Sequence, residues 1–121
     1  MVNTWIVISI FVIHFFADFV CQPHWQAVFK SKKWSALLGH TMTYSLIFSA
    51  ASIGWGFGMD QHALFWFGPI TFVAHTVTDY VTSRVNARLW KQERTHDFFV
   101  SVGFDQLLHA AQLLLTYYLL T

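Results

Sequence analysis

Four apolar stretches, each of roughly 20 residues, most constrain what this chain can fold into. They cover residues 4–21, 35–55, 63–85 and 97–120. Each is long enough to cross a bilayer core as a helix that rises 1.5 Å per residue. Lipid cannot hydrogen-bond an open strand edge, so such spans must be helical. The pattern predicts an all-α, integral membrane four-helix bundle, with residues 1–121 as a single transmembrane domain.

The scarcity of charge weighs against a soluble bundle. Hydrophobic residues make up 55% of the chain and charged residues only 11%, whereas a soluble domain carries about 25% charged residues. So few charged residues provide too little polar surface to cover a globular protein in water. We therefore expect the lipid bilayer as a partner and no nucleic acid, and the sequence leaves open whether the chain forms an oligomer.

The seven basic residues predict the orientation in the membrane. Lys30, Lys32 and Lys33 lie between the first two stretches, Arg84 lies at the end of the third, and Arg88, Lys91 and Arg94 lie between the last two. Short loops rich in lysine and arginine stay on the cytoplasmic side. We expect a multi-pass protein of the bacterial inner (cytoplasmic) membrane, with these two loops in the cytoplasm and both termini outside.

The first of these loops has a pattern of its own. Pro23 ends the first stretch, and residues 24–34 mix tryptophans and other apolar residues with lysines. This mixture predicts a short amphipathic interfacial segment between the first and second helices, its lysines facing the headgroups. A solvated basic loop anchored by tryptophans fits the same pattern.

Ionisable side chains interrupt the apolar stretches. They are Asp18, Asp79, Asp105, His14, His40, His75 and His109. An aspartate at the centre of a bilayer costs roughly 2.5–3.5 kcal/mol on insertion scales, so each of these carboxylates must find a partner.

The spacing of these residues indicates the partners. Three stretches each carry one histidine and one aspartate four residues apart, and side chains so spaced share one face of a helix. The pairs are His14 with Asp18, His75 with Asp79, and Asp105 with His109. His40 adds an imidazole from the second stretch. In the expected orientation all these groups lie at a similar depth, in the cytoplasmic half of the bundle.

Imidazole and carboxylate ligands together suit a divalent metal, and such sites are commonly built between the facing helices of a bundle. We expect zinc, with manganese or iron as alternatives, and one or two ions. The candidate ligands are His14, Asp18, His40, His75, Asp79 and His109, with Gln22, Gln106 and Tyr44 in supporting positions. An unmetallated polar network and a bis-histidine haem site are the alternatives.

Motifs from all four stretches occur in an order that is typical of one family. They are His14-Phe-Phe-Ala-Asp18 with Gln22, Leu37-Leu38-Gly-His40 with Tyr44, His75-Thr-Val-Thr-Asp79, and Asp105-Gln106-Leu-Leu-His109. Over nearly its whole length the chain resembles the small bacterial and phage membrane proteins grouped as domain of unknown function 3307. The resemblance implies a helical membrane protein and, more loosely, similarity to membrane-bound metal-dependent hydrolases, without indicating a substrate.

These observations favour a metal-dependent hydrolase that acts from the cytoplasmic side on a lipid-linked, phosphate-bearing or membrane-proximal substrate. Asp105 is the candidate general base. The residues expected to bind an anionic headgroup are Lys30, Lys32, Arg84 and Arg88, which serve equally well as topology determinants alone.

Two other functions fit the same sequence. One is a non-enzymatic, metal-stabilised membrane scaffold that binds a partner protein, for which a phage origin is one possibility. The other is a proton or ion path through the histidines and aspartates. A path must cross the whole membrane, and the outer halves of the stretches are apolar, so this hypothesis ranks last.

Overall fold

The computed structural model describes residues 2–55 and 57–121, and in these ranges every regular element is a helix. The elements are α1 (Thr4–Phe15), the π-helical segment η1 (Phe16–Val20), α2 (His24–Phe29), α3 (Trp34–Trp55), α4 (Gln61–Lys91) and α5 (Thr95–Leu120). The all-helical prediction is confirmed. The four apolar stretches correspond to α1 with η1, α3, α4 and α5, and the interfacial segment contains the short helix α2.

Capping residues and a proline set the helix boundaries. The Asn3 side chain accepts a hydrogen bond of 3.0 Å from the backbone nitrogen of Trp5, at the start of α1. At the start of α4, Asp60 accepts one of 2.8 Å from the backbone nitrogen of Ala63. Such bonds satisfy amide groups that have no partner within the first turn. Pro23 separates η1 from α2, because proline cannot donate the hydrogen bond that would continue a helix.

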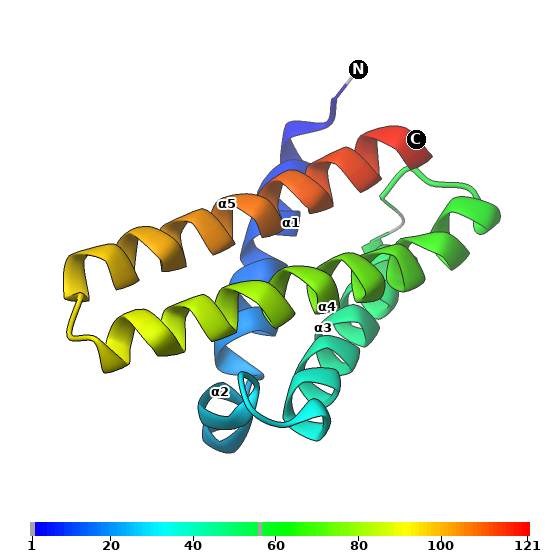
Figure 1. Cartoon of the computed structure of the whole chain (residues 1–121). Coiled ribbons are helices and arrows are strands. Elements are labelled where there is room, and N and C mark those ends of the chain that lie inside the picture. The colour runs from blue at the N-terminus through cyan, green and yellow to red at the C-terminus, as the bar shows by residue number, and fades with distance from the viewer. Residues whose placement is uncertain (1, 56) are drawn as a thin grey trace.

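The four long segments close into a ring of antiparallel neighbours. α4 packs along α3 on one side and along α5 on the other, and α1 with η1 contacts both α3 and α5. The short helix α2 packs against α3. In Figure 1, α4 and α5 form a long hairpin that α1 crosses, while both termini lie on the side away from the α4–α5 turn. Every long segment can therefore direct side chains into one shared interior.

The interior of the bundle is divided along its length. One half is apolar and aromatic, and its largest fully buried side chains are Tyr44, Phe48, Phe57, Phe67, Ile10 and Leu113. The other half contains the buried histidines and aspartates. Because hydrogen-bonding and ionic groups need partners when they are removed from water, they gather in one place rather than disperse through the core.

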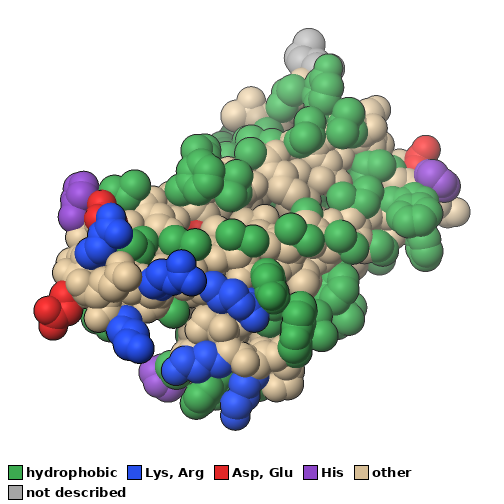
Figure 2. All heavy atoms as spheres, in the orientation of Figure 1, with side chains coloured by type: hydrophobic (Ala, Val, Ile, Leu, Met, Phe, Trp, Pro, Cys, Tyr) green, Lys and Arg blue, Asp and Glu red, His purple; other side chains and the backbone are tan. Residues whose placement is uncertain are grey.

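Apolar side chains cover the outer faces of the helices, where Trp5, Phe65 and Leu119 are 78%, 67% and 71% exposed. Figure 2 shows hydrophobic side chains spread over the visible helical faces and lysines and arginines gathered at one end. By length and composition, Trp34–Gly54 of α3 and all of α5 are able to cross a membrane. α1 with η1 is apolar but shorter, and α4 is more polar because it carries His75, Asp79 and several basic residues.

Candidate metal centre

The backbone around Asp18 is unusual, because this residue lies in the π-helical segment that continues α1. The backbone nitrogen of Cys21 donates to the carbonyl of Phe16 at 2.8 Å, five residues earlier. A π-helical turn is wider than an α-helical one and frequently occurs at functional sites. Here it changes the direction of the helix face at Asp18, whose carboxylate is buried in the bundle with an exposed fraction of 4%.

Four side chains from three elements converge on one point. One ligand atom from each of Asp18, His75, Asp79 and His109 lies within 4.8 Å of all the others, and all four residues are buried. His75 Nε2 is 3.3 Å from Asp79 Oδ2 and 3.5 Å from Asp18 Oδ1. His109 Nε2 is 3.0 Å from Asp79 Oδ1. We call these four residues the Asp/His cluster.

His40 from α3 borders the Asp/His cluster. Its Nε2 lies 3.0 Å from Asp18 Oδ1 and 3.4 Å from Asp79 Oδ2. Its ring centroid is 5.0 Å from that of His75. His40 and His75 therefore both direct Nε2 at Asp18 and Asp79, and His109 directs Nε2 at Asp79 from α5.

His14 lies further from the Asp/His cluster than His40 does, and both of its ring nitrogens form hydrogen bonds with residues outside the cluster. Nδ1 is 2.7 Å from the Tyr44 hydroxyl, and Nε2 is 2.7 Å from Gln106 Oε1. The amide oxygen can only accept, so Nε2–H donates and Nδ1 accepts from the tyrosine. Its distance to the cluster is 4.0 Å, from Nε2 to Asp18 Oδ2. The structure thus places His14 and Tyr44 in a chain of hydrogen bonds that supports the cluster.

Asp105 and Gln106 extend this network on α5. Gln106 Nε2 donates to Asp18 Oδ2 at 3.0 Å and to Asp105 Oδ2 at 3.2 Å. The other oxygen of Asp105 accepts a short hydrogen bond from the Thr82 hydroxyl. Asp105 Oδ2 is also 3.2 Å from His109 Nε2. Asp105 therefore lies beside the Asp/His cluster rather than within it.

A lysine reaches the cluster from the loop after α2. Lys30 Nζ donates to Asp79 Oδ2 at 3.0 Å, and its side chain is 21% exposed. Burial disfavours the ammonium, but the nearby carboxylates of Asp79 and Asp18 outweigh that effect and raise the pKa of Lys30 above its ordinary value.

The charges in this region fit a divalent cation. Asp18, Asp79 and Asp105 are 4%, 1% and 8% exposed, and Lys30 is the cation that the described residues bring to them. With neutral imidazoles, three negative charges and one positive charge leave two negative charges uncompensated. Ligand atoms about 2.1 Å from a tetrahedral zinc lie roughly 3.4 Å apart, close to the separations within the cluster.

The orientation of His75 supports the same fit. Although Nε2 of this fully buried imidazole lies near two carboxylate oxygens, neither of its nitrogens completes a hydrogen bond with the described residues. A buried polar atom without a partner carries a free-energy penalty. Coordination of a metal by Nε2 would remove that penalty for this nitrogen.

The other residues that the sequence predicted for the site lie outside the cluster. Gln22 Oε1 is buried without a hydrogen-bond partner among the described residues. Lys32 and Arg88 are exposed. The Arg84 guanidinium lies 3.6 Å from the ring centroid of Tyr80, which holds it against α4.

Two contacts of this region were missed from the sequence. Thr82 was not assigned a role, although it lies three residues after Asp79 and therefore on the same side of α4. Lys30 was predicted to face an anionic headgroup, and no helical periodicity in its loop indicates that it turns inward to Asp79.

The fold and the cluster define a class: an all-helical bundle with an apolar exterior and a buried group of carboxylates and imidazoles of the kind that binds metal. Residues 6–121 match the family described as Protein of unknown function (DUF3307). The chain belongs to this family, as the motifs of its four long helices predicted. No curated protein and no solved structure matches the chain.

Proposed function

We propose that this protein is a four-span membrane protein that binds a divalent metal, most simply zinc, and hydrolyses a phosphate-bearing lipid from the cytoplasmic side. The observation that carries the proposal is the convergence of Asp18, His75, Asp79 and His109 within 4.8 Å, buried in the bundle. These ligand types and separations suit zinc, and manganese or iron would accept the same donors. His40 is positioned as a further ligand for the same ion or a second one.

The membrane orientation follows from the distribution of charge. The seven basic residues lie at one end of the bundle, in the turn before α3 and from the last turns of α4 to the start of α5, and the positive-inside rule assigns that end to the cytoplasm. α1 with η1 and α4 would cross beside α3 and α5, their polar groups facing the interior of the ring. The Asp/His cluster would then lie in the cytoplasmic half, within reach of headgroups.

Each residue has a defined task in this function. A divalent metal bound to these ligands would lower the pKa of a coordinated water towards neutrality. Asp105 is adjacent to the cluster but outside it, and would accept a proton from the attacking water. Thr82 and Gln106 hold the two oxygens of Asp105, and Lys30 supplies the nearest positive charge.

Metal content of the purified chain tests the binding step. Elemental analysis of the full-length protein in detergent should find about one or two zinc ions per chain, with a loss of most of that zinc in Asp79→Asn and in His75→Ala. Asp97→Asn and His96→Ala, which change a half-buried and an exposed residue at the basic end, should retain it. Absence of zinc, manganese and iron from the folded wild-type protein would remove the proposal.

Release of phosphate tests the chemical step. The zinc-loaded protein should release phosphate from dioctanoyl phosphatidic acid, and Asp105→Asn should lower kcat by about 100-fold or more while zinc content stays unchanged. Loss of zinc together with activity in this variant would instead identify Asp105 as a ligand.

A metal-stabilised scaffold is the second candidate, and the closed environment of the cluster favours it. All four residues of the cluster are buried, and Lys30 covers Asp79 from the cytoplasmic end. A scaffold would bind zinc and lose thermal stability without it, yet release no phosphate in the same assay. The two measurements together therefore separate the scaffold from the enzyme.

A further inference from the structure

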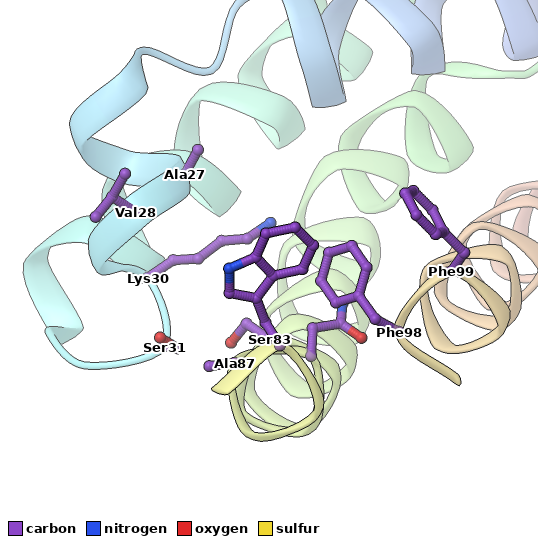
Figure 3. Close-up of a pocket in the computed structure, with 10 residues that line it drawn as sticks. Ala27, Val28, Lys30, Ser31, Ser83, Ala87, Phe98 and Phe99 are labelled. Carbon is purple, nitrogen blue, oxygen red and sulfur yellow. The ribbon is translucent and has the colours of Figure 1, made fainter. Parts of the chain in front are cut away.

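A pocket of about 510 Å³ lies between α2 and the ends of α4 and α5 that meet at their turn. Its apolar walls are Ala27, Val28, Ala87, Trp90, Phe98 and Phe99. Figure 3 shows Phe98 and Phe99 projecting from α5 on one side and Lys30 extending across from the other. The volume is in the range of about 300–1,000 Å³ that is typical of small-molecule sites.

The polar lining of this pocket contains groups that lack partners. Ser83 Oγ and Asn86 Oδ1 are buried and make no hydrogen bond with the described residues. Ser83, which is 7% exposed, lies four residues after Asp79 and therefore one turn along the same face of α4. A hydroxyl and an amide at this position can bind the head of a ligand, next to the Asp/His cluster.

Lys30 belongs both to the pocket and to the cluster. It lines the pocket, while its ammonium is 3.0 Å from Asp79 Oδ2. A divalent ion that binds Asp79 would compete for the same carboxylate and repel the ammonium. The four-carbon stem of lysine is flexible, so the released ammonium would turn into the pocket that its stem already lines.

We propose that this pocket binds an amphiphile with an anionic head, and that metal binding at Asp79 releases Lys30 to hold that head. The inference rests on the proposed metal centre and names the ligand class of the same site. The apolar walls, with Trp90 61% and Phe99 62% exposed, suit a hydrocarbon chain better than a free anion. The Lys30 ammonium, the Ser83 hydroxyl and the amide nitrogen of Asn86 would donate hydrogen bonds to the head beside the chain.

The variant Lys30→Met tests this exchange of Lys30 for a metal at Asp79, because it should raise the affinity for zinc and lower the affinity for the lipid. Without the competing ammonium, the affinity of the full-length protein for zinc should rise by about fivefold or more, since one nearby unit charge is worth about this factor. The affinity of the zinc-loaded protein for dioctanoyl phosphatidic acid should fall by about fivefold. Lys33→Met removes the same charge from an exposed residue of the same loop and should change neither value.

Wild-type protein supplies a direct readout of the exchange. It should bind dioctanoyl phosphatidic acid more tightly with zinc than without it. Zinc absent from the wild type would overturn the metal centre and the exchange together. Zinc binding whose affinity is the same in Lys30→Met would overturn the exchange alone and leave the proposed function standing.

The ligand class is tested separately by comparing phosphatidic acid with its headgroup alone and its diacylglycerol part alone. Inorganic phosphate and dioctanoylglycerol should each bind more weakly than dioctanoyl phosphatidic acid. Phe99→Ala, which shortens an exposed wall residue, should weaken phosphatidic acid binding by about fivefold or more and leave zinc affinity unchanged. Equal binding of inorganic phosphate and phosphatidic acid, or full lipid affinity in Phe99→Ala, would overturn the amphiphile assignment.

Discussion

Gln106 shows how one uncharged side chain can organise several ionisable ones. Its amide oxygen accepts from His14, and its amide nitrogen donates to Asp18 and Asp105. These bonds join α1, η1 and α5. Because Tyr44 donates to the other nitrogen of His14, the chain of bonds fixes the orientation of the His14 ring. The orientation of Asp18 in the Asp/His cluster therefore depends on a residue that binds no metal itself.

Replacement of this amide should weaken metal binding without removing a ligand. We expect Gln106→Leu to lower the affinity for zinc by about 10–100-fold, the range usual for partners that orient metal ligands. A competition titration with a fluorescent chelator would measure it. Gln112→Leu is the matched control, because Gln112 lies on the same helix but bonds to Thr71 and Thr116. Equal affinities in the two variants would contradict the role of Gln106.

Residue spacing predicted the histidines and aspartates because each pair lies within one helix. Four-residue spacing fixes which side chains share a face, so His75 and Asp79 had to point the same way. The contact of His40 with Asp18, by contrast, depends on how α3 packs against η1, and that of Lys30 depends on a loop. Residue spacing within one helix predicts neither of these contacts. The sequence could indicate only that the histidines and aspartates lie at a similar depth.

The π-helical segment η1 was equally hard to predict from the sequence. Apart from Asp18, the sequence of η1 is apolar like that of α1, and nothing in the pattern around Asp18 distinguishes a π-helical turn from an α-helical one. One helix bound was easier, because Pro23 supplies a recognisable signal for the end of the first helix. α4 extends beyond the predicted 63–85 to Gln61–Lys91, since polar residues can continue a helix outside the apolar region.

The contact between α3 and α4 depends on one small residue. Gly68 is buried, and a Cβ atom added there would fall 1.9 Å from Ser49 Oγ and 3.3 Å from Ser49 Cβ. Small residues of this kind allow two helices to approach closely when lipid provides no hydrophobic drive for their association. The two helices each carry a histidine of the cluster region, so their spacing also sets the separation of His40 and His75.

A larger side chain at this contact should destabilise the bundle. We expect Gly68→Val to lower the free energy of unfolding by about 1–3 kcal/mol, because the helices must separate or distort. The measurement is the thermal unfolding midpoint in detergent. Gly103→Val is the control, since a Cβ at Gly103 meets nothing within 4 Å and valine has a slightly higher helix propensity than glycine. A similar midpoint in both variants would show that the α3–α4 contact tolerates the added volume.

At the scale of the whole molecule, polarity changes along the bundle axis rather than from the inside to the outside. Aromatic side chains such as Phe48 and Phe67 fill one half of the interior, the Asp/His cluster occupies the other, and the apolar outer faces surround both. A water-soluble bundle has the opposite arrangement, with a polar exterior. In a bilayer this arrangement would keep the buried histidines and aspartates away from lipid and next to the end that carries the basic residues.

The proposed orientation predicts the direction in which α4 crosses the membrane, and this direction can be measured. A helix of 31 residues is about 46 Å long, which exceeds the roughly 30 Å bilayer core, so both of its ends should reach water. Gln61 and Gln92 flank this length and are exposed. In a Cys21→Ser background, Gln61→Cys should react with a membrane-impermeant maleimide in intact spheroplasts, and Gln92→Cys only after lysis. Reaction of Gln92→Cys alone would reverse the proposed orientation, and reaction of both in intact spheroplasts would mean that α4 does not cross the membrane.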